Sequence, residues 1–465
     1  MLDAFLFLFT FGLLAAGLRR PFVWVLAYIY IDILAPQKIG WTLTPMVPFS
    51  LIAFIAAFAG WLLADNKQGA RFTFRQGLMV ALLAYVTLTA TWAAFPQFGW
   101  EKWSWVWKAL VFAIFLPLTL RTRLRIEATV LVMVLSIAAI IISGGLKTVA
   151  GGGGYGTLYF FVSDNSGLYE SSTIACVAIA VIPLILWLTK YGTIFPPDWR
   201  VKLFAAALIF ACLLIPVGTE ARTGLLCAAL MAALLLRSAR HRFVYAMLAP
   251  LAAAIAVPFL PQSYLDRMST IENHQEDESA ETRVAVWQWT WNYAKDHPLG
   301  GGFEAYRANS FSYKKLVETG DANASSTETI LVTDKGRAYH SAYFEMLGEQ
   351  GWPGIILWLW LQALGLWHME WIRRRLKKRD DPADRPLRDL ATALQNGQIV
   401  YLVGALFVGI AFQPFVFMLI ALQIALWTMV RRAEQERAAS EGKKRAAAKG
   451  GARRAAKPVA QGSPA

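Results

Sequence analysis

Two arginines and one histidine, widely separated in the sequence, have side chains suited to chemistry on a phosphate-bearing substrate. Arg222 lies in the polar turn GTEARTG between two apolar blocks, whereas Arg283 and His340 lie near the two ends of a hydrophilic segment. A guanidinium group stays charged and binds oxyanions through paired hydrogen bonds, so two arginines could hold a diphosphate. An imidazole can accept a proton near neutral pH. The three residues together predict a site that binds a diphosphate and activates a hydroxyl group.

Each of these residues also has a structural interpretation when it is considered alone. Arg222 could extend to lipid headgroups, Arg283 could be a solvated charge on a helix, and His340 could be a structural hydrogen-bonding residue. The sequence contains neither an HExxH nor a CxxC motif, and its five histidines are scattered, so we expect no metal and no other cofactor. All three cysteines fall in apolar blocks, where packing is their expected role: Cys176, Cys212 and Cys227.

Three further residues could belong to the same site. Lys147 precedes a glycine-rich loop and could reach the same anionic group. Glu345 and Glu349 follow His340 on a predicted helix, and they could orient the imidazole or bind sugar hydroxyls. Two exposed charges on a helix surface would give the same pattern. We rank all three residues below His340 and the two arginines.

The elements that position these residues are predicted to be transmembrane helices. The chain has 465 residues, of which 57% are hydrophobic and 16% are charged, and its mean hydropathy is +0.43. Soluble proteins contain about 25% charged residues. Apolar blocks such as 203–217, 243–260 and 355–371 approach the ~20 residues that a membrane-spanning helix needs. Because backbone groups within a bilayer must pair internally, we predict an all-α polytopic membrane protein with about 12–13 transmembrane helices.

The basic residues predict the orientation of the chain. Most of the 45 Lys and Arg residues fall in one alternating set of connections, which includes the C-terminal tail. The positive-inside rule places that set and the C-terminus in the cytoplasm. The turn that carries Arg222 and the hydrophilic segment then lie on the outer face. Cytoplasmic loops and the tail account for much of the net charge of +14, so no nucleic-acid partner is expected.

We divide the chain into four parts. Residues 1–260 form N-terminal transmembrane helices, 261–339 form a loop or helical domain on the outer face, 340–430 form C-terminal transmembrane helices, and 431–465 form a disordered basic cytoplasmic tail. The tail could attract anionic lipids of the inner leaflet or simply anchor the topology.

Tryptophans are concentrated in two places. Within the insertion, Val284, Trp287 and Trp291 recur at helical spacing and predict one apolar face of a helix that lies at the membrane interface. Earlier in the chain, tryptophans and lysines are interleaved: Trp100, Lys102, Trp103, Trp105, Trp107 and Lys108. We interpret this second cluster as a belt at the membrane interface rather than as a platform for a glycan.

Five short motifs, taken in order, resemble the O-antigen ligase and polymerase superfamily, which includes bacterial protein O-oligosaccharyltransferases. They are TEARTG at 219–224, Thr282-Arg283, HPLGGG at 297–302, His340-Ser341 and EQG at 349–351. The resemblance covers residues 165–430. The family commonly has serine before the arginine of the turn. This chain has Ala221 there, which removes a hydroxyl group but leaves the guanidinium group in place.

The resemblance implies a GT-C-like membrane glycosyltransferase that needs no metal. Such an enzyme moves a glycan from an undecaprenyl-diphosphate carrier to a hydroxyl group of a cell-envelope acceptor. The favoured reaction is ligation of O-antigen to lipid A–core oligosaccharide in lipopolysaccharide biosynthesis. The enzyme would lie among the lipids of the bacterial inner membrane, with its active site on the periplasmic face. Arg222 and Arg283 would hold the diphosphate, and His340 would accept the proton of the attacking hydroxyl, with inversion at the sugar carbon.

Two other functions remain open at this stage. An O-antigen polymerase or a protein O-oligosaccharyltransferase would use the same donor chemistry with another acceptor. A transporter of the lipid-linked substrate would bind the same headgroup without needing a base. The transporter is disfavoured because the apolar blocks hold few ionisable residues, whereas transporters commonly place polar groups near the middle of the membrane.

Overall fold

The computed structural model describes residues 1–151, 167–238, 278–319, 326–379 and 381–455, together with a few isolated residues between 241 and 265. Six of the described helices are long and apolar enough to cross a membrane. Three shorter apolar helices accompany them: α2 (Phe22–Leu34), α5 (Phe49–Leu63) and α6 (Phe74–Ala90). The predicted all-α polytopic membrane fold is confirmed. The predicted span at 243–260 lies mostly outside the described residues.

The remaining helices vary widely in length. The longer ones are α1 (Leu2–Arg19), α7 (Pro96–Thr119), α8 (Arg123–Gly151), α9 (Ser171–Ala180), α10 (Ile182–Tyr191), α11 (Trp199–Gly218), α12 (Arg222–Ser238), α15 (Glu278–Asp296), α16 (Ala342–Arg379), α17 (Arg385–Gly404) and α18 (Pro414–Ala455). Short helical turns connect some of them: α3 (Pro36–Ile39), α4 (Leu43–Met46), η1 (Gly167–Tyr169), η3 (Ala305–Ala308) and η4 (Pro382–Asp384).

The middle of the bundle is formed by helices that are apolar on nearly every side. In α9 the residues from Thr173 to Ala180 are all buried, and in α18 those from Phe415 to Leu426 are all buried. By contrast, α1 exposes Phe5, Leu8 and Phe11. A helix that is apolar all round must be covered by protein or by lipid. We therefore place α9 and α18 inside the bundle and α1 against lipid. As expected, the three cysteines are buried and unpaired.

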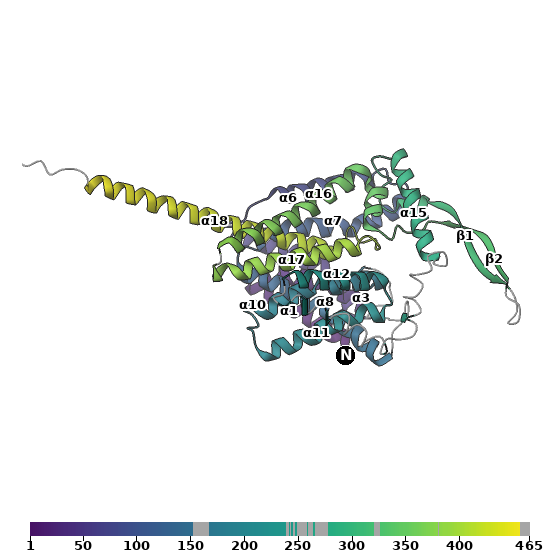
Figure 1. The fold of residues 1–465 in the computed structure, drawn as a ribbon, viewed down its shortest axis with the longest axis horizontal. Coiled ribbons are helices and arrows are strands. Elements are labelled where there is room, and N and C mark those ends of the chain that lie inside the picture. The colour runs from purple at the N-terminus through teal and green to yellow at the C-terminus, as the bar shows by residue number, and fades with distance from the viewer. Residues whose placement is uncertain are drawn as a thin grey trace, which may run out of the picture.

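Two segments project from opposite ends of the bundle (Figure 1). A hairpin of β1 (Ser310–Thr319) and β2 (Ser326–Lys335) extends from one end, and the second half of α18 extends from the other. The insertion and the basic tail are thus separated by the length of the bundle. The distribution of basic residues in the sequence likewise predicts the insertion and the tail on opposite sides of the membrane.

The hairpin corrects the prediction that the insertion is helical. β1 pairs antiparallel with β2, with Ser310 opposite Lys335. β2 has the sequence STETILVTDK, whose β-branched residues favour an extended chain. At the base of the hairpin, the Asn309 side chain donates to Arg337 O at 2.7 Å and accepts from Arg337 N at 3.0 Å. Two strands with a closed base therefore lie between η3 and α16.

The C-terminal tail corrects a second prediction. α18 continues to Ala455, whereas composition predicts disorder from residue 431. Glu434 accepts hydrogen bonds from Arg375 and Arg379 of α16, which fixes the beginning of the tail. The following residues are rich in Ala, Lys, Arg and Glu, which have high helix propensity. Residues 456–465 lie outside the described part of the chain.

Candidate active site

The segment HPLGGG, which follows α15, is fixed against the beginning of α16. Three backbone hydrogen bonds join them: Gly301 N to Gly348 O (3.0 Å), Gly302 N to Glu349 O (2.9 Å) and Trp352 N to Pro298 O (3.0 Å). Gly351 has a φ of 61° at a kink within α16, and a Cβ at this position would lie 2.3 Å from Pro298 O. Two of the motifs that carry the resemblance therefore form one tight backbone contact, and this contact attaches the insertion to the membrane helices.

α15 carries Arg283 and is attached to the loop that carries His340. Trp287, four residues after Arg283, donates from Nε1 to Tyr339 O at 2.9 Å. Its ring also stacks on that of Phe344, with 5.1 Å between the centroids. Residues four apart lie on the same face of a helix, so Arg283 projects on the side that meets this loop. The structure thus brings Arg283 and His340 together.

α15 packs on the protein through a face that the sequence pattern did not single out. The residues that pack inward are Thr282, Val286, Thr290 and Ala294. Val284 and Trp291, which the pattern assigned to an apolar face, are 48% and 47% exposed. The small and β-branched residues allow α15 to approach its neighbours closely, and Val284 and Trp291 remain at the surface.

His340 immediately precedes α16 in a left-handed backbone conformation, with a φ of 47°. Its neighbours Tyr339 and Ser341 are buried, whereas His340 itself is exposed. Desolvation by the surrounding protein and the charge of Arg283 lower the pKa of His340 below its ordinary value of 6.5, and Glu170 opposes this shift. At neutral pH the imidazole is therefore mainly uncharged and able to accept a proton.

Arg222 is the first residue of α12 and is half-buried. The start of α12 packs against α9, because a Cβ on Gly224 would lie 3.0 Å from Ala175 Cβ. Glu170 caps the N-terminus of α9, one turn before Ala175. Glu170 is also the carboxylate that acts on His340. Arg222 therefore begins its helix at the same end of the bundle as His340.

Lys147 lies near the C-terminal end of α8 and is exposed. The next residue, Thr148, is buried against Gly218, where an added Cβ would lie 1.9 Å from Thr148 Oγ1. Gly218 ends α11 and leads into the turn before Arg222. Lys147 is thus placed beside the turn that carries Arg222.

Glu345 and Glu349 point into the protein, so their interpretation as exposed helix charges is wrong. They are 5% and 0% exposed. Lys102 of α7 lies between them, with Nζ 2.7 Å from Glu345 Oε1 and 2.8 Å from Glu349 Oε1. Glu345 also accepts from Ala411 N, and Glu349 accepts from Glu304 N, both at 3.0 Å. These carboxylates anchor the beginning of α16 to α7, to η3 and to the loop before α18.

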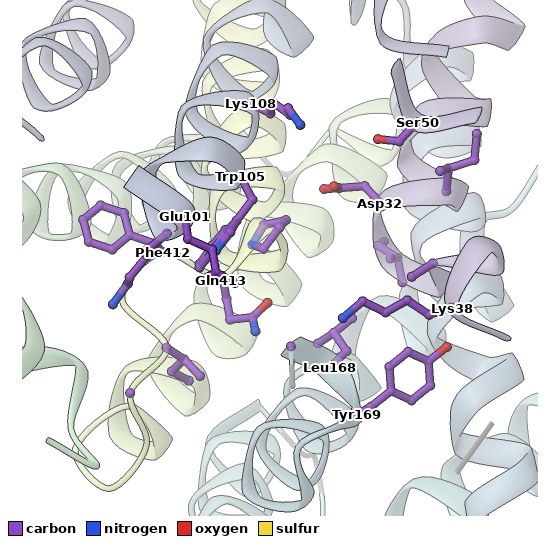
Figure 2. Close-up of a pocket in the computed structure, with 18 of the residues that line it drawn as sticks. Asp32, Lys38, Ser50, Glu101, Trp105, Lys108, Leu168, Tyr169, Phe412 and Gln413 are labelled. Atoms are coloured by element: carbon purple, nitrogen blue, oxygen red, sulfur yellow. The ribbon is translucent and has the colours of Figure 1, made fainter. Parts of the chain in front are cut away.

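A cavity of about 610 Å³ lies beside this ionic cluster (Figure 2). Helices from both halves of the chain contribute to its lining. Charged residues of both signs face it: Asp32, Lys38, Glu101, Lys102, Lys108, Glu304, Arg307 and Glu345. Tyr169 also lines it and directly precedes Glu170, the residue that acts on His340. The cavity therefore adjoins the end of the bundle that carries the three predicted residues.

Sequence reasoning missed the contribution of α7 to this region. Lys102 pairs with a carboxylate 243 residues away, and no local pattern indicates such a contact. The available signal was the spacing of Phe98, Lys102 and Trp105, which lie on one face of a helix. The neighbouring tryptophans concealed it, because a cluster of that composition is typical of a membrane interface.

Two families match this chain. Residues 1–193 match a family of unknown function, DUF5935, and residues 204–359 match the family described as O-Antigen ligase. The second match contains Arg222, Arg283 and His340. No curated protein matches the chain. The match over residues 204–359 confirms the resemblance drawn from the motifs, and it supports a role in membrane glycosyl transfer of the ligase or polymerase type.

Proposed function

We propose that this chain, an O-antigen-ligase-like membrane protein, transfers a glycan from an undecaprenyl-diphosphate carrier to a hydroxyl group of a cell-envelope acceptor. The favoured acceptor is lipid A–core oligosaccharide, so the reaction would be ligation of O-antigen on the periplasmic face of the inner membrane. The proposal rests on the proximity of Arg283 to His340, at the end of the bundle where α12 begins with Arg222.

In this proposal the two arginines act on the donor. Their guanidinium groups bind the diphosphate oxygens and stabilise the negative charge that grows as the bond between sugar and diphosphate breaks. Lys147 adds a third cation beside the turn of Arg222. Because these side chains supply the positive charge, the reaction requires no metal ion.

His340 acts on the acceptor. The acceptor oxygen forms a bond to the anomeric carbon while the bond from that carbon to the diphosphate oxygen breaks, and the hydroxyl proton passes to the imidazole. The lowered pKa of His340 keeps the imidazole ready to receive this proton at neutral pH. General-base assistance typically contributes about 10²–10⁴-fold to a rate. A single displacement of this kind inverts the configuration at the sugar carbon.

The alternative acceptors are a growing O-antigen chain and a protein hydroxyl group. A polymerase or a protein O-oligosaccharyltransferase would perform the same displacement with these acceptors, and the description of the matched family favours the ligase. A transporter would use the arginines but would not need His340 as a base.

Transfer of a labelled lipid-linked glycan by the purified protein tests the proposal. We expect Arg222→Ala and Arg283→Ala to weaken donor binding and slow transfer. We expect His340→Ala to lose most transfer while donor binding persists. Lys295→Ala is the matched control, because it removes an exposed cation from the same helix as Arg283.

The acceptor is identified by supplying lipid A–core oligosaccharide, unlabelled O-antigen donor or protein in separate reactions. Label on lipid A–core supports the ligase, whereas label on the other acceptors alone identifies an alternative enzyme. Transfer by His340→Ala at the wild-type rate would remove the base from the mechanism.

A further inference from the structure

Two buried hydrogen-bond acceptors line the cavity beside the ionic cluster and have no partner among the described residues. They are Asp32 Oδ2, near the end of α2, and Gln37 Oε1, in α3. Buried oxygens are normally satisfied, because an unpaired one loses the hydrogen bonds it had with water. Figure 2 shows the Asp32 carboxylate directed into the cavity, towards the side that carries Trp105 and Lys108. This wall of the cavity is suited to a ligand that donates hydrogen bonds.

The opposite wall is one face of α7. Phe98, Lys102, Trp105 and Lys108 recur every three or four residues, so their side chains project on the same side, and all four line the cavity. The guanidinium group of Arg307 lies 3.7 Å from the centroid of the Phe98 ring. This wall thus combines aromatic surfaces with cationic hydrogen-bond donors.

The charges of the lining exclude several classes of ligand. A diphosphate would meet the carboxylates of Asp32, Glu101 and Glu304, and Lys102 is already bound by two glutamates. An isoprenoid chain has no hydrogen-bond donor and would leave Asp32 Oδ2 and Gln37 Oε1 unsatisfied. Neither the leaving group nor the lipid tail of the proposed donor therefore suits this cavity.

A saccharide suits both walls. Its hydroxyl groups can donate to carboxylate and amide oxygens and accept from lysine and arginine, and its C–H faces can pack against aromatic rings. The volume of about 610 Å³ falls within the range of about 300–1,000 Å³ that is usual for small-molecule sites. An oligosaccharide segment can therefore enter the cavity and satisfy the acceptors of α2 and α3.

We infer that this cavity binds a saccharide portion of the donor or of the acceptor during transfer. Glu345, in its lining, lies three residues after Ala342, so it is about 4.5 Å along α16 from the end that follows His340. A glycan held there would extend towards the imidazole. The inference rests on the proposed function for the identity of the saccharide. It also gives the N-terminal family of unknown function a part in substrate binding, because Asp32 and Trp105 both belong to it.

Titration of two soluble glycans into the purified protein tests the inference. The probes are the glycan released from the lipid-linked donor and the core oligosaccharide freed from lipid A, each measured by calorimetry. We expect Asp32→Ala and Trp105→Ala to weaken the binding of one of these glycans by roughly tenfold or more. The first substitution removes a hydrogen-bond acceptor, and the second removes an aromatic contact. Trp100→Ala is the matched control: Trp100 is on the same helix and is 43% exposed, against 41% for Trp105, but it does not line the cavity.

The glycan that loses affinity identifies the source of the saccharide. Unchanged affinity of both glycans in Asp32→Ala and Trp105→Ala, or no binding of either glycan to the wild-type protein at millimolar concentration, would overturn the inference. Melting temperatures report whether each variant folds, and Gln37→Ala replaces Asp32→Ala if the latter does not. The binding of undecaprenyl diphosphate without a glycan should be unchanged in these variants and weakened in Arg283→Ala. If Arg283→Ala binds undecaprenyl diphosphate as tightly as the wild type, the result would count against the proposed function but not against the saccharide site.

Discussion

Replacing Gly351 by alanine should release the insertion from the membrane helices. The φ of Gly351 is 61°, and an added Cβ would lie 2.3 Å from Pro298 O, a backbone atom that cannot rotate away. With a φ of 61° and a ψ of −165°, this backbone conformation costs an L-residue about 1–3 kcal/mol. Relief of the clash requires the HPLGGG segment to move, which breaks three backbone hydrogen bonds worth about 1 kcal/mol each. We therefore expect a destabilisation of about 4–6 kcal/mol, which is large for one substitution.

Gly167→Ala is the control that separates the two contributions. Gly167 has a φ of 62°, but no described atom lies within 4 Å of the position of its Cβ. Only the backbone penalty of about 1–2 kcal/mol applies there. Thermal unfolding in detergent measures both variants, and limited proteolysis reports whether the insertion has detached. Gly351→Ala should also lose transfer, because Arg283 and His340 are then no longer held together. Equal stability losses for Gly351→Ala and Gly167→Ala would refute the view that this contact holds the insertion in place.

Three other outcomes follow from contacts described above. Because the pKa of His340 lies below 6.5, transfer at saturating donor should decline only below that pH, and Arg283→Gln should move the decline to higher pH by removing a positive charge. A pH–rate profile that does not move would contradict the pairing of these residues. Lys102→Met should lower the free energy of unfolding by about 3–5 kcal/mol, because two buried carboxylates lose their cation. Adding Glu349→Gln to this variant should restore part of the lost stability. A melting temperature equal to that of the wild type in Lys102→Met would show that the ionic cluster does not stabilise the fold. Deleting residues 442–465 should leave the melting temperature and the transfer rate unchanged, because the described ion pairs of the tail all involve residues before 442. Slower transfer by the shortened protein would assign the tail a part in the reaction.

The membrane bundle could be predicted, and three candidate site residues could be proposed, because their signals are local. An apolar block predicts a membrane helix by its own length, without knowledge of its neighbours. The glycines of HPLGGG likewise predict a turn by themselves. Arg222 and Arg283 stood out because each is a cation at the edge of an apolar block or an amphipathic helix. The proximity of Arg283 to His340, and the position of Arg222 at the same end of the bundle, depend on how α9, α12, α15 and α16 pack.

The features that escaped prediction depend on contacts between distant segments. Glu345 and Glu349 are four residues apart, as charges on an exposed helix surface often are. Only the packing of α7 against α16 reveals that both bind Lys102. The strands of the hairpin carry polar residues at many positions, so their alternation is weak in the sequence. The tail has too few apolar residues to indicate an element of its own. It is helical because α18 precedes it and α16 supplies partners for Glu434.

The closed base of the β-hairpin separates two kinds of evolutionary constraint. Asn309 and the backbone of Arg337 join the ends of the hairpin, and the HPLGGG contact fixes the chain on the α15 side. Strands beyond Asn309 can therefore lengthen, shorten or change composition without displacing Arg283 from His340. A lineage could exchange this outer appendage, and with it the surface that the insertion presents, while the arrangement of Arg283 and His340 beneath it stays the same.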